Sequence, residues 1–153
     1  SMLRLKAAAS SISDFTSGTF LPVIGDPTVN NASRVIFCSG KIYHDLVAER
    51  NRLNDSSTAI VRVERLYPFP VAQMEVEAKK HPNANLLWVQ DEPANQGAWP
   101  HVALSTTESI GGTGVDARVL RRISRRAAAS PATGSHHLHE DEAKALLDEA
   151  FTR

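Results

Sequence analysis

The sequence predicts one α/β domain built on a largely parallel β-sheet that helices cover on both faces. About five short apolar runs alternate with about four helical segments along the chain, and this alternation is typical of a parallel sheet with crossover helices. Several of the runs are continuously apolar, which indicates strands that are buried on both faces. A single sheet with two helical layers follows from these two patterns.

Length and composition indicate which kinds of protein and partner are compatible with this chain. The chain of 153 residues suits one compact domain. Its 17 basic and 17 acidic residues cancel, so no bulk field favours a nucleic acid or a membrane surface as partner. Cys38 is the single cysteine, which excludes an internal disulfide framework. No apolar run approaches the roughly 18 residues of a membrane-spanning helix, and no signal peptide is visible.

The beginning of the chain differs in composition from the rest. Residues 1–18 are rich in alanine and serine, and we interpret them as a linker or lead-in segment from a preceding domain. Two apolar side chains in this segment, Ile12 and Phe15, are expected to anchor it to a neighbouring surface. The single α/β domain then spans 19–153. It opens with a proline-interrupted apolar run over 19–24, a pattern that favours an edge strand.

The central part of the chain predicts three strands and two helices. Its strands are expected to be buried, because they are apolar and rich in β-branched residues. The helix after the first of them carries an apolar stripe on one face. Prolines before the second helix prevent it from starting earlier. The predicted order is strand 34–38, helix 41–53, strand 59–63, helix 71–80 and strand 86–90.

The last part of the chain predicts two helices around one strand. A helix should include Pro100 in its first turn and reach about residue 108. A glycine-rich loop over 111–114 precedes a strand over 118–123, which ends in a basic edge. The final helix is predicted over 139–151. Three acidic residues, 140–142, would lie in its first turn, where the helix dipole favours negative charge.

Two adjacent acids, Asp91 and Glu92, follow the apolar strand that ends near Gln90. A carboxylate at the end of a strand is suited to general acid or base catalysis when burial tunes it. Adjacent residues of an extended segment point to opposite sides, so at most one of the two is expected to face a crevice. Because no partnered nucleophile or metal motif accompanies them, the pattern favours turn or interface chemistry.

Three further features are candidates for an anion site, a reactive thiol and a metal site. Residues 39–41 open a helix after a strand, where an anion can bind, but the glycines of a phosphate loop or a dinucleotide fingerprint are absent. Cys38 ends a buried strand and is expected to be a structural thiol. The histidines 136, 137 and 139 lack the cysteines or spaced carboxylates of zinc sites. We interpret them as part of a loop that leads into the last helix.

The strongest charge cluster is arginine-rich, and two interpretations of it remain open. It is either a solvated sheet edge, balanced by the acidic start of the last helix, or a site for an anion or a partner, because guanidinium groups bind phosphate and carboxylate through paired hydrogen bonds. Aromatic residues do not interleave the arginines, which argues against nucleic acid. The cluster comprises Arg118, Arg121, Arg122, Arg125 and Arg126, and Arg62 and Arg65 fit the same two interpretations.

Four segments together resemble the 2-oxoglutarate dehydrogenase E1 family, most closely its actinobacterial members. RVIFCSGKIYHDL, AIVRVERLYPFP, WVQDEPANQGAW and SPATG are similar to family segments in the same order, and they start at residues 34, 59, 88 and 130. The sequence departs from the family at Arg65, where glutamine is common, and at Asp91, where the family has glutamate.

The resemblance implies the C-terminal domain of a larger enzyme. Its expected fold is like the transketolase C-terminal domain: a three-layer α/β/α sandwich on a mixed five-stranded sheet of order 1-3-2-4-5, with strand 1 antiparallel. In the family, preceding domains bind thiamine diphosphate and Mg²⁺ between two subunits. The enzyme decarboxylates 2-oxoglutarate and passes the succinyl group to E2 lipoamide, in a tricarboxylic acid cycle complex with E2 and E3. The resemblance implies a bacterial cytoplasmic location.

The resemblance also implies where this domain acts. No catalytic, cofactor-binding or metal-binding residue is expected in it, so an isolated fragment should be inactive. Asp91, Glu92, Asn95 and Gln96 would form an interface turn towards the preceding E1 domains or the second E1 subunit, with Trp99 packed beneath. The arginines would form a surface for an acidic partner or an effector, such as acetyl-CoA or a forkhead-associated regulator: Arg62, Arg65, Arg121, Arg122, Arg125 and Arg126.

Two alternatives remain open beside this interpretation. One is a stand-alone regulatory module that binds an anion or a nucleotide. The other is a separate small α/β enzyme of flavodoxin-like type. A preference for 2-oxoglutarate over 2-oxoadipate would be set by residues outside this segment.

Overall fold

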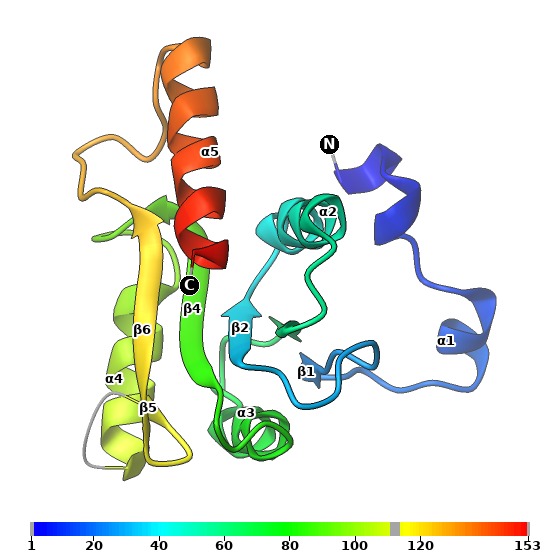
Figure 1. The fold of residues 1–153 in the computed structure, drawn as a ribbon. Coiled ribbons are helices and arrows are strands. Elements are labelled where there is room, and N and C mark those ends of the chain that lie inside the picture. The colour runs from blue at the N-terminus through cyan, green and yellow to red at the C-terminus, as the bar shows by residue number, and fades with distance from the viewer. Residues whose placement is uncertain (1, 111–113, 153) are drawn as a thin grey trace.

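The computed structural model describes residues 2–110 and 114–152. A central sheet is covered on one face by α3 (Val71–Lys79) and α4 (Trp99–Ile110), and on the other by α2 (Ile42–Leu53) and α5 (His136–Phe151). Figure 1 shows these layers, with α5 and α2 lying on the same side of the sheet. The predicted three-layer α/β/α sandwich is confirmed.

The sheet has the predicted strand order. Its strands lie in the order β1-β3-β2-β4-β6-β5; β1 and β5 are antiparallel to their neighbours, whereas β3, β2, β4 and β6 run parallel. The first five match the predicted order 1-3-2-4-5, and β5 is a two-residue addition that forms a hairpin with β6. The bounds are β1 (Val23–Ile24), β2 (Arg34–Cys38), β3 (Thr58–Val63), β4 (Asn85–Pro93), β5 (Gly114–Val115) and β6 (Arg118–Arg125).

Two hydrophobic clusters fill the space between the layers, and the alternation of side chains along the strands separates them. In β2, Phe37 faces the α3 and α4 layer together with Trp88. Its neighbour Ile36 faces the α2 and α5 layer, with Leu46 and Leu146. All of these except Leu146 are fully buried, and each such side chain contributes about 1.5–3 kcal/mol on burial.

Several predicted boundaries were wrong. The strand predicted over 118–123 continues to Arg125. The edge strand is shorter than 19–24, because Pro22 has no N–H to extend the ladder; only its carbonyl pairs, with the N–H groups of Glu64 and Arg65. The strand predicted to end at residue 90 continues to Pro93. The last helix begins at His136, so residues 140–142 lie beyond its first turn.

The three histidines therefore belong to a helix and not to a loop. Ser135, in an extended conformation, precedes the helix, and its carbonyl accepts the hydrogen bond from the His139 N–H. The predicted loop over 111–114 lies outside the described residues except for Gly114, which starts β5.

Of the described residues, none in the N-terminal segment belongs to the two hydrophobic clusters. It contains two 3₁₀ turns, Met2–Arg4 and Lys6–Ala8, and the short helix α1 (Ile12–Thr16). Figure 1 shows this segment extending away from the sheet. Residue 2 and residues 4–22 are all exposed or half-buried. We call residues 2–22 the N-terminal arm.

Candidate functional site

A crevice opens where β2 and β4 end side by side. These strands are parallel neighbours, and the chain leaves β2 for α2 on one face but leaves β4 for α4 on the other. Sheets of this type bind ligands or partners where two such connections diverge. The cavity has a volume of about 590 Å³, and its wall is formed by Ser39, Gly40, Leu66, Tyr67, Trp88, Gln90, Glu92, Gly97, Ala98 and His101.

The side chain of Gln90 organises this crevice. It is 3% exposed, and its Oε1 accepts hydrogen bonds from Trp88 Nε1 at 3.1 Å and from the Trp99 N–H at 2.8 Å. Its Nε2 donates to the carbonyls of Pro93 at 3.1 Å and Gln96 at 2.8 Å. The first N–H groups of a helix have no partner within the helix, so Gln90 caps α4 while it holds the turn before α4.

The two acids lie on the last residues of β4. Glu92 lines the crevice, whereas Asp91 does not, because consecutive strand residues point to opposite sides. Neither carboxylate makes a hydrogen bond or an ion pair with the described residues. Gly97, with φ of +65°, passes so close that a Cβ there would lie 2.8 Å from the Glu92 Cβ. Glycine is therefore required at this turn.

Asn95 and Gln96 bind another part of the same chain. Asn95 Nδ2 donates to the Ala128 carbonyl at 3.0 Å, and Asn95 Oδ1 accepts from the Ala128 N–H at 3.0 Å. Gln96 Nε2 donates to the same carbonyl at 2.8 Å. These two side chains fix the segment that follows β6. Trp99 packs against the core beneath the turn, and the guanidinium of Arg122 lies 5.7 Å from its ring centre.

Arg125 is held by the chain itself. Its side chain is 8% exposed. The Nε donates to the Asp91 carbonyl at 2.6 Å, and Nη2 donates to the Pro131 carbonyl at 2.8 Å. Its Nη1 reaches Thr133 Oγ1 at 3.4 Å and Glu142 Oε2 at 3.5 Å. This arginine therefore ties the end of β6 to the loop before α5 and to α5.

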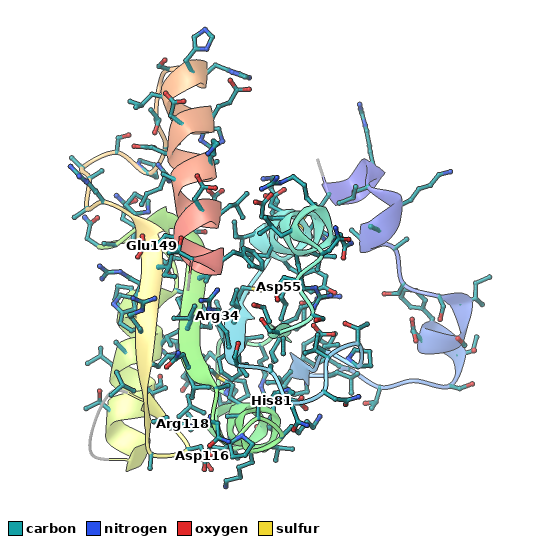
Figure 2. All side chains as sticks on the ribbon, viewed as in Figure 1. Arg34, Asp55, His81, Asp116, Arg118 and Glu149 are labelled. Atoms are coloured by element: carbon teal, nitrogen blue, oxygen red, sulfur yellow. The ribbon has the colours of Figure 1, made fainter. Side chains whose placement is uncertain are left out.

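Arg118 has a similar structural role at the other end of β6. Figure 2 shows it beside His81 and Asp116. Its guanidinium donates to the carbonyls of Ala78, at 2.6 Å, and of His81, at 2.7 Å. Because the last carbonyls of a helix have no partner within it, Arg118 caps the end of α3.

The other arginines do not form one surface. Arg121 lies on the same side of β6 as Ile123, towards α5, and Arg122 lies on the side of α4. Arg126 follows the strand and is exposed.

Arg62 and Arg65 lie at the end of β3, separated from β6 by two strands, or roughly 14 Å at the usual strand spacing. Arg62 Nε donates to Glu64 at 2.9 Å, and its guanidinium lies 4.8 Å from the Tyr43 ring centre. Arg65 Nε donates to the Pro68 carbonyl at 3.0 Å.

The thiol of Cys38 and the potential metal ligands are the remaining candidate groups. Cys38 is fully buried, and burial, opposed by the charge of Arg62, raises the pKa of its thiol to about 12. Within residues 2–110 and 114–152, no group of three or more histidine, cysteine or acidic side chains is placed to hold a metal ion. In the same residues, no helix is long and apolar enough to cross a membrane.

A model of the 2-oxoglutarate dehydrogenase C-terminal family matches residues 9–151. The chain belongs to this family. It is 45% identical to the 2-oxoglutarate dehydrogenase E1 component of Cupriavidus necator over 157 residues, which cover 100% of the chain and 16% of that protein. It is 44% identical to the multifunctional 2-oxoglutarate metabolism enzyme of Mycobacterium sp. (strain JLS) over 161 residues, which cover 99% of the chain and 12% of that protein.

The family resemblance predicted from the sequence is thereby confirmed, including its similarity to actinobacterial proteins. The multifunctional 2-oxoglutarate metabolism enzyme of Mycolicibacterium vanbaalenii is a further relative, 39% identical over 159 residues. This C-terminal domain spans only 12% to 16% of the length of the relatives named here. Within it, the matched region includes α1 of the N-terminal arm as well as both sides of the crevice.

Proposed function

We propose that this C-terminal domain is part of a longer 2-oxoglutarate dehydrogenase E1 polypeptide and that its own task is assembly. The names of the relatives support membership of a longer E1 polypeptide, together with the small share of their length that the domain covers. In this proposal the whole enzyme decarboxylates 2-oxoglutarate and transfers the succinyl group to lipoamide on E2. The domain packs against the preceding domains and the second E1 subunit.

The N-terminal arm carries this proposal. Ile12 and Phe15 are 83% and 81% exposed, and Phe20 and Leu21 are 66% and 51% exposed. Burial of such a side chain is worth about 1.5–3 kcal/mol, and contiguous exposed apolar groups mark interaction sites. The family match begins at residue 9 and so includes the part of the arm that carries these four side chains. Its apolar side chains are suited to pack on a neighbouring domain.

The crevice offers a second contact surface. Glu92 lines the crevice together with Tyr67, which is 83% exposed, while the Asp91 carboxylate lies on the other side of β4. In this proposal, Asp91 and Glu92 contact the neighbouring domain or subunit, as predicted for the interface turn. Asn95 and Gln96 instead stabilise the turn through hydrogen bonds to Ala128 of the same chain. As candidate contacts for an effector or a partner we retain two separate groups, Arg62 and Arg65 at the end of β3 and Arg121, Arg122 and Arg126 on or directly after β6. Arg125 is already bound by four groups of its own chain.

Thiamine diphosphate and Mg²⁺ are assigned to the preceding domains. The described residues offer no cluster of metal-binding side chains, and residues 39–41 lack the glycine pattern of a phosphate loop. In this proposal, the described donor groups of the domain hold neither cofactor. The carbanion chemistry that thiamine diphosphate supplies therefore belongs to the rest of the polypeptide.

The proposal is tested in the full-length protein by Phe15→Asp. A buried carboxylate without a partner is strongly unfavourable, so we expect loss of subunit association and of decarboxylation of 2-oxoglutarate with thiamine diphosphate and Mg²⁺. Ser10→Asp adds the same charge at a polar position of the arm and should change neither. The 153-residue chain with Phe15→Asp should unfold at the same urea concentration as the unsubstituted chain.

Two results would contradict the proposal. One is full activity and normal association of the Phe15→Asp protein. The other is turnover of 2-oxoglutarate by the 16.7 kDa chain alone, or a native product of that mass with no larger parent.

A further inference from the structure

The outer edge of β6 is open over most of its length. On its inner side β6 pairs with β4, and on its outer side β5 pairs only with Arg118 and Val119. Within the described residues, 120–125 therefore have no strand beyond them. Figure 1 shows β6 at the border of the sheet, with α4 behind it. Such an edge presents unpaired N–H and C=O groups that can accept another strand.

This open edge carries positive charge that the chain does not neutralise. Arg121, Arg122 and Arg126 are exposed, and none of them makes an ion pair with a described carboxylate. Glu149 lines the same hollow as Arg121 but lies beyond ion-pair distance. The surplus charge favours an acidic occupant, since opposite charges on paired strands stabilise the pairing.

The same charges disfavour a second copy of this chain. Two β6 edges laid against each other would set arginines opposite arginines, and like charges directly opposite are destabilising. Charged side chains on an edge strand are a common means by which proteins prevent pairing of identical edges. A neutral apolar strand would exclude water from the guanidinium groups of Arg121 and Arg122 without offering them hydrogen-bond acceptors in its place. An acidic partner strand has neither cost.

We propose that residues 120–125 of β6 bind an extended acidic segment of another protein chain as an added strand. The backbone of the edge would supply the hydrogen bonds, as in other cases of strand addition. Arg121 and Arg122 point to opposite faces of the sheet, so two consecutive acidic residues, one on each face, match them. The stacking of Arg122 on Trp99 holds one guanidinium in place for this contact.

The test uses the full-length protein that carries the domain and a fluorescent six-residue peptide with two central glutamates flanked by valine and threonine. Fluorescence anisotropy measures binding. Three kinds of altered peptide are tested for binding to the unsubstituted protein. One has lysines in place of the glutamates, and one has a residue inserted between the glutamates. The third kind is N-methylated at every second residue, in two versions that start at adjacent residues. We expect the first two to weaken binding about tenfold. Only one methylation pattern should abolish it, because alternate N–H groups face the edge.

Substitutions in the protein test the charges. Arg121→Glu and Arg122→Glu should each weaken binding of the parent peptide about tenfold. Lys6→Glu makes the same charge change on the exposed arm and should have no effect. Binding that survives both methylation patterns would overturn strand addition. Equal weakening by Lys6→Glu would overturn the site, and so would the absence of binding at millimolar peptide.

Discussion

The indole Nε1 of Trp88 donates a 3.1 Å hydrogen bond to the side-chain oxygen of Gln90 in the interior of the domain. The two side chains lie on the same side of β4, two residues apart, at 0% and 3% exposure. The oxygen that Trp88 binds also accepts the first N–H of α4. One amide therefore connects the central strand, the turn after it and the next helix.

Replacement of Gln90 should destabilise the domain far more than replacement of the nearby Gln96. Gln90→Ala leaves the Trp88 indole N–H, the Trp99 N–H and buried carbonyls without partners, and each unsatisfied group costs about 1–3 kcal/mol. We expect a loss of about 3 kcal/mol in the free energy of unfolding, measured with urea. Gln96→Ala removes one exposed hydrogen bond and should cost under about 1 kcal/mol. Equal effects would contradict the role of Gln90.

Two adjacent arginines should behave differently. Arg125→Ala removes one contact to β4 and three contacts to the loop before α5 and to α5, and we expect a loss of about 2–3 kcal/mol in the free energy of unfolding. Limited proteolysis should then cleave the segment 126–135 faster. Arg126→Ala, the matched control at an exposed position, should leave both measurements unchanged. Similar cleavage rates for the two variants would be evidence against this assignment.

The ion pair between Asp26 and Arg50 should be a major contributor to stability. The two side chains are 6% and 11% exposed, and the same carboxylate accepts the Ile60 N–H at 2.9 Å. Asp26→Ala leaves a buried guanidinium uncompensated, which costs about 3–5 kcal/mol. Asp148→Ala removes an exposed pair with Lys144, and such pairs are worth at most about 1 kcal/mol. Urea unfolding at pH 7 distinguishes the two outcomes.

The stability of the domain should also fall in acid. Burial acts to raise the pKa of Asp26, but hydrogen bonds from Thr28, Ile60 and Arg50 outweigh it and hold the pKa below the usual 3.8. The unfolded chain then binds the proton more readily than the folded one, so the contribution is complete above about pH 5. It is lost as pH falls through the lowered value. Asp26→Asn should flatten the decline between about pH 5 and 2, measured as the urea midpoint at each pH. A slope equal to that of the unsubstituted chain would contradict this.

The thiol of Cys38 should be unreactive until the domain unfolds. It is fully buried in β2, and burial raises its pKa to about 12. Because the thiolate is the reactive form, a disulfide reagent at pH 8 should label the native chain very slowly and label the chain in denaturant at once. The labelling rate in low urea should follow the unfolding equilibrium. Rapid labelling of the native chain would show that the strand is accessible.

Much of the fold was predictable from local patterns. The strand Arg34–Cys38 was predicted to the residue, because a continuous apolar run that is buried on both faces has no alternative placement in the sheet. The helices after β2 and β3 were predicted to within one residue at each end. The order of the strands came from the family resemblance, since local patterns carry no information about which strands lie side by side.

The candidate site was predictable only in its position. One of the two acids at the end of the strand, Glu92, faces the crevice as expected, but the sequence drew attention to Asp91 and Glu92 and passed over Gln90. A glutamine at the end of an apolar strand carries no signal of its own, although a polar side chain on the buried face of a strand needs partners. Those partners are backbone groups up to nine residues away, and only the folded turn brings them together.

From the sequence came the family, the layered α/β class and the apolar strands of the core, because apolar periodicity and motif order are local properties of the chain. The tertiary structure alone decided which charged side chains are available. Arg125 and Arg126 are the same residue type and are adjacent in sequence, yet the Arg125 side chain is bound by its own chain and Arg126 is exposed. That difference depends on which carbonyls and carboxylates the fold places within hydrogen-bond distance.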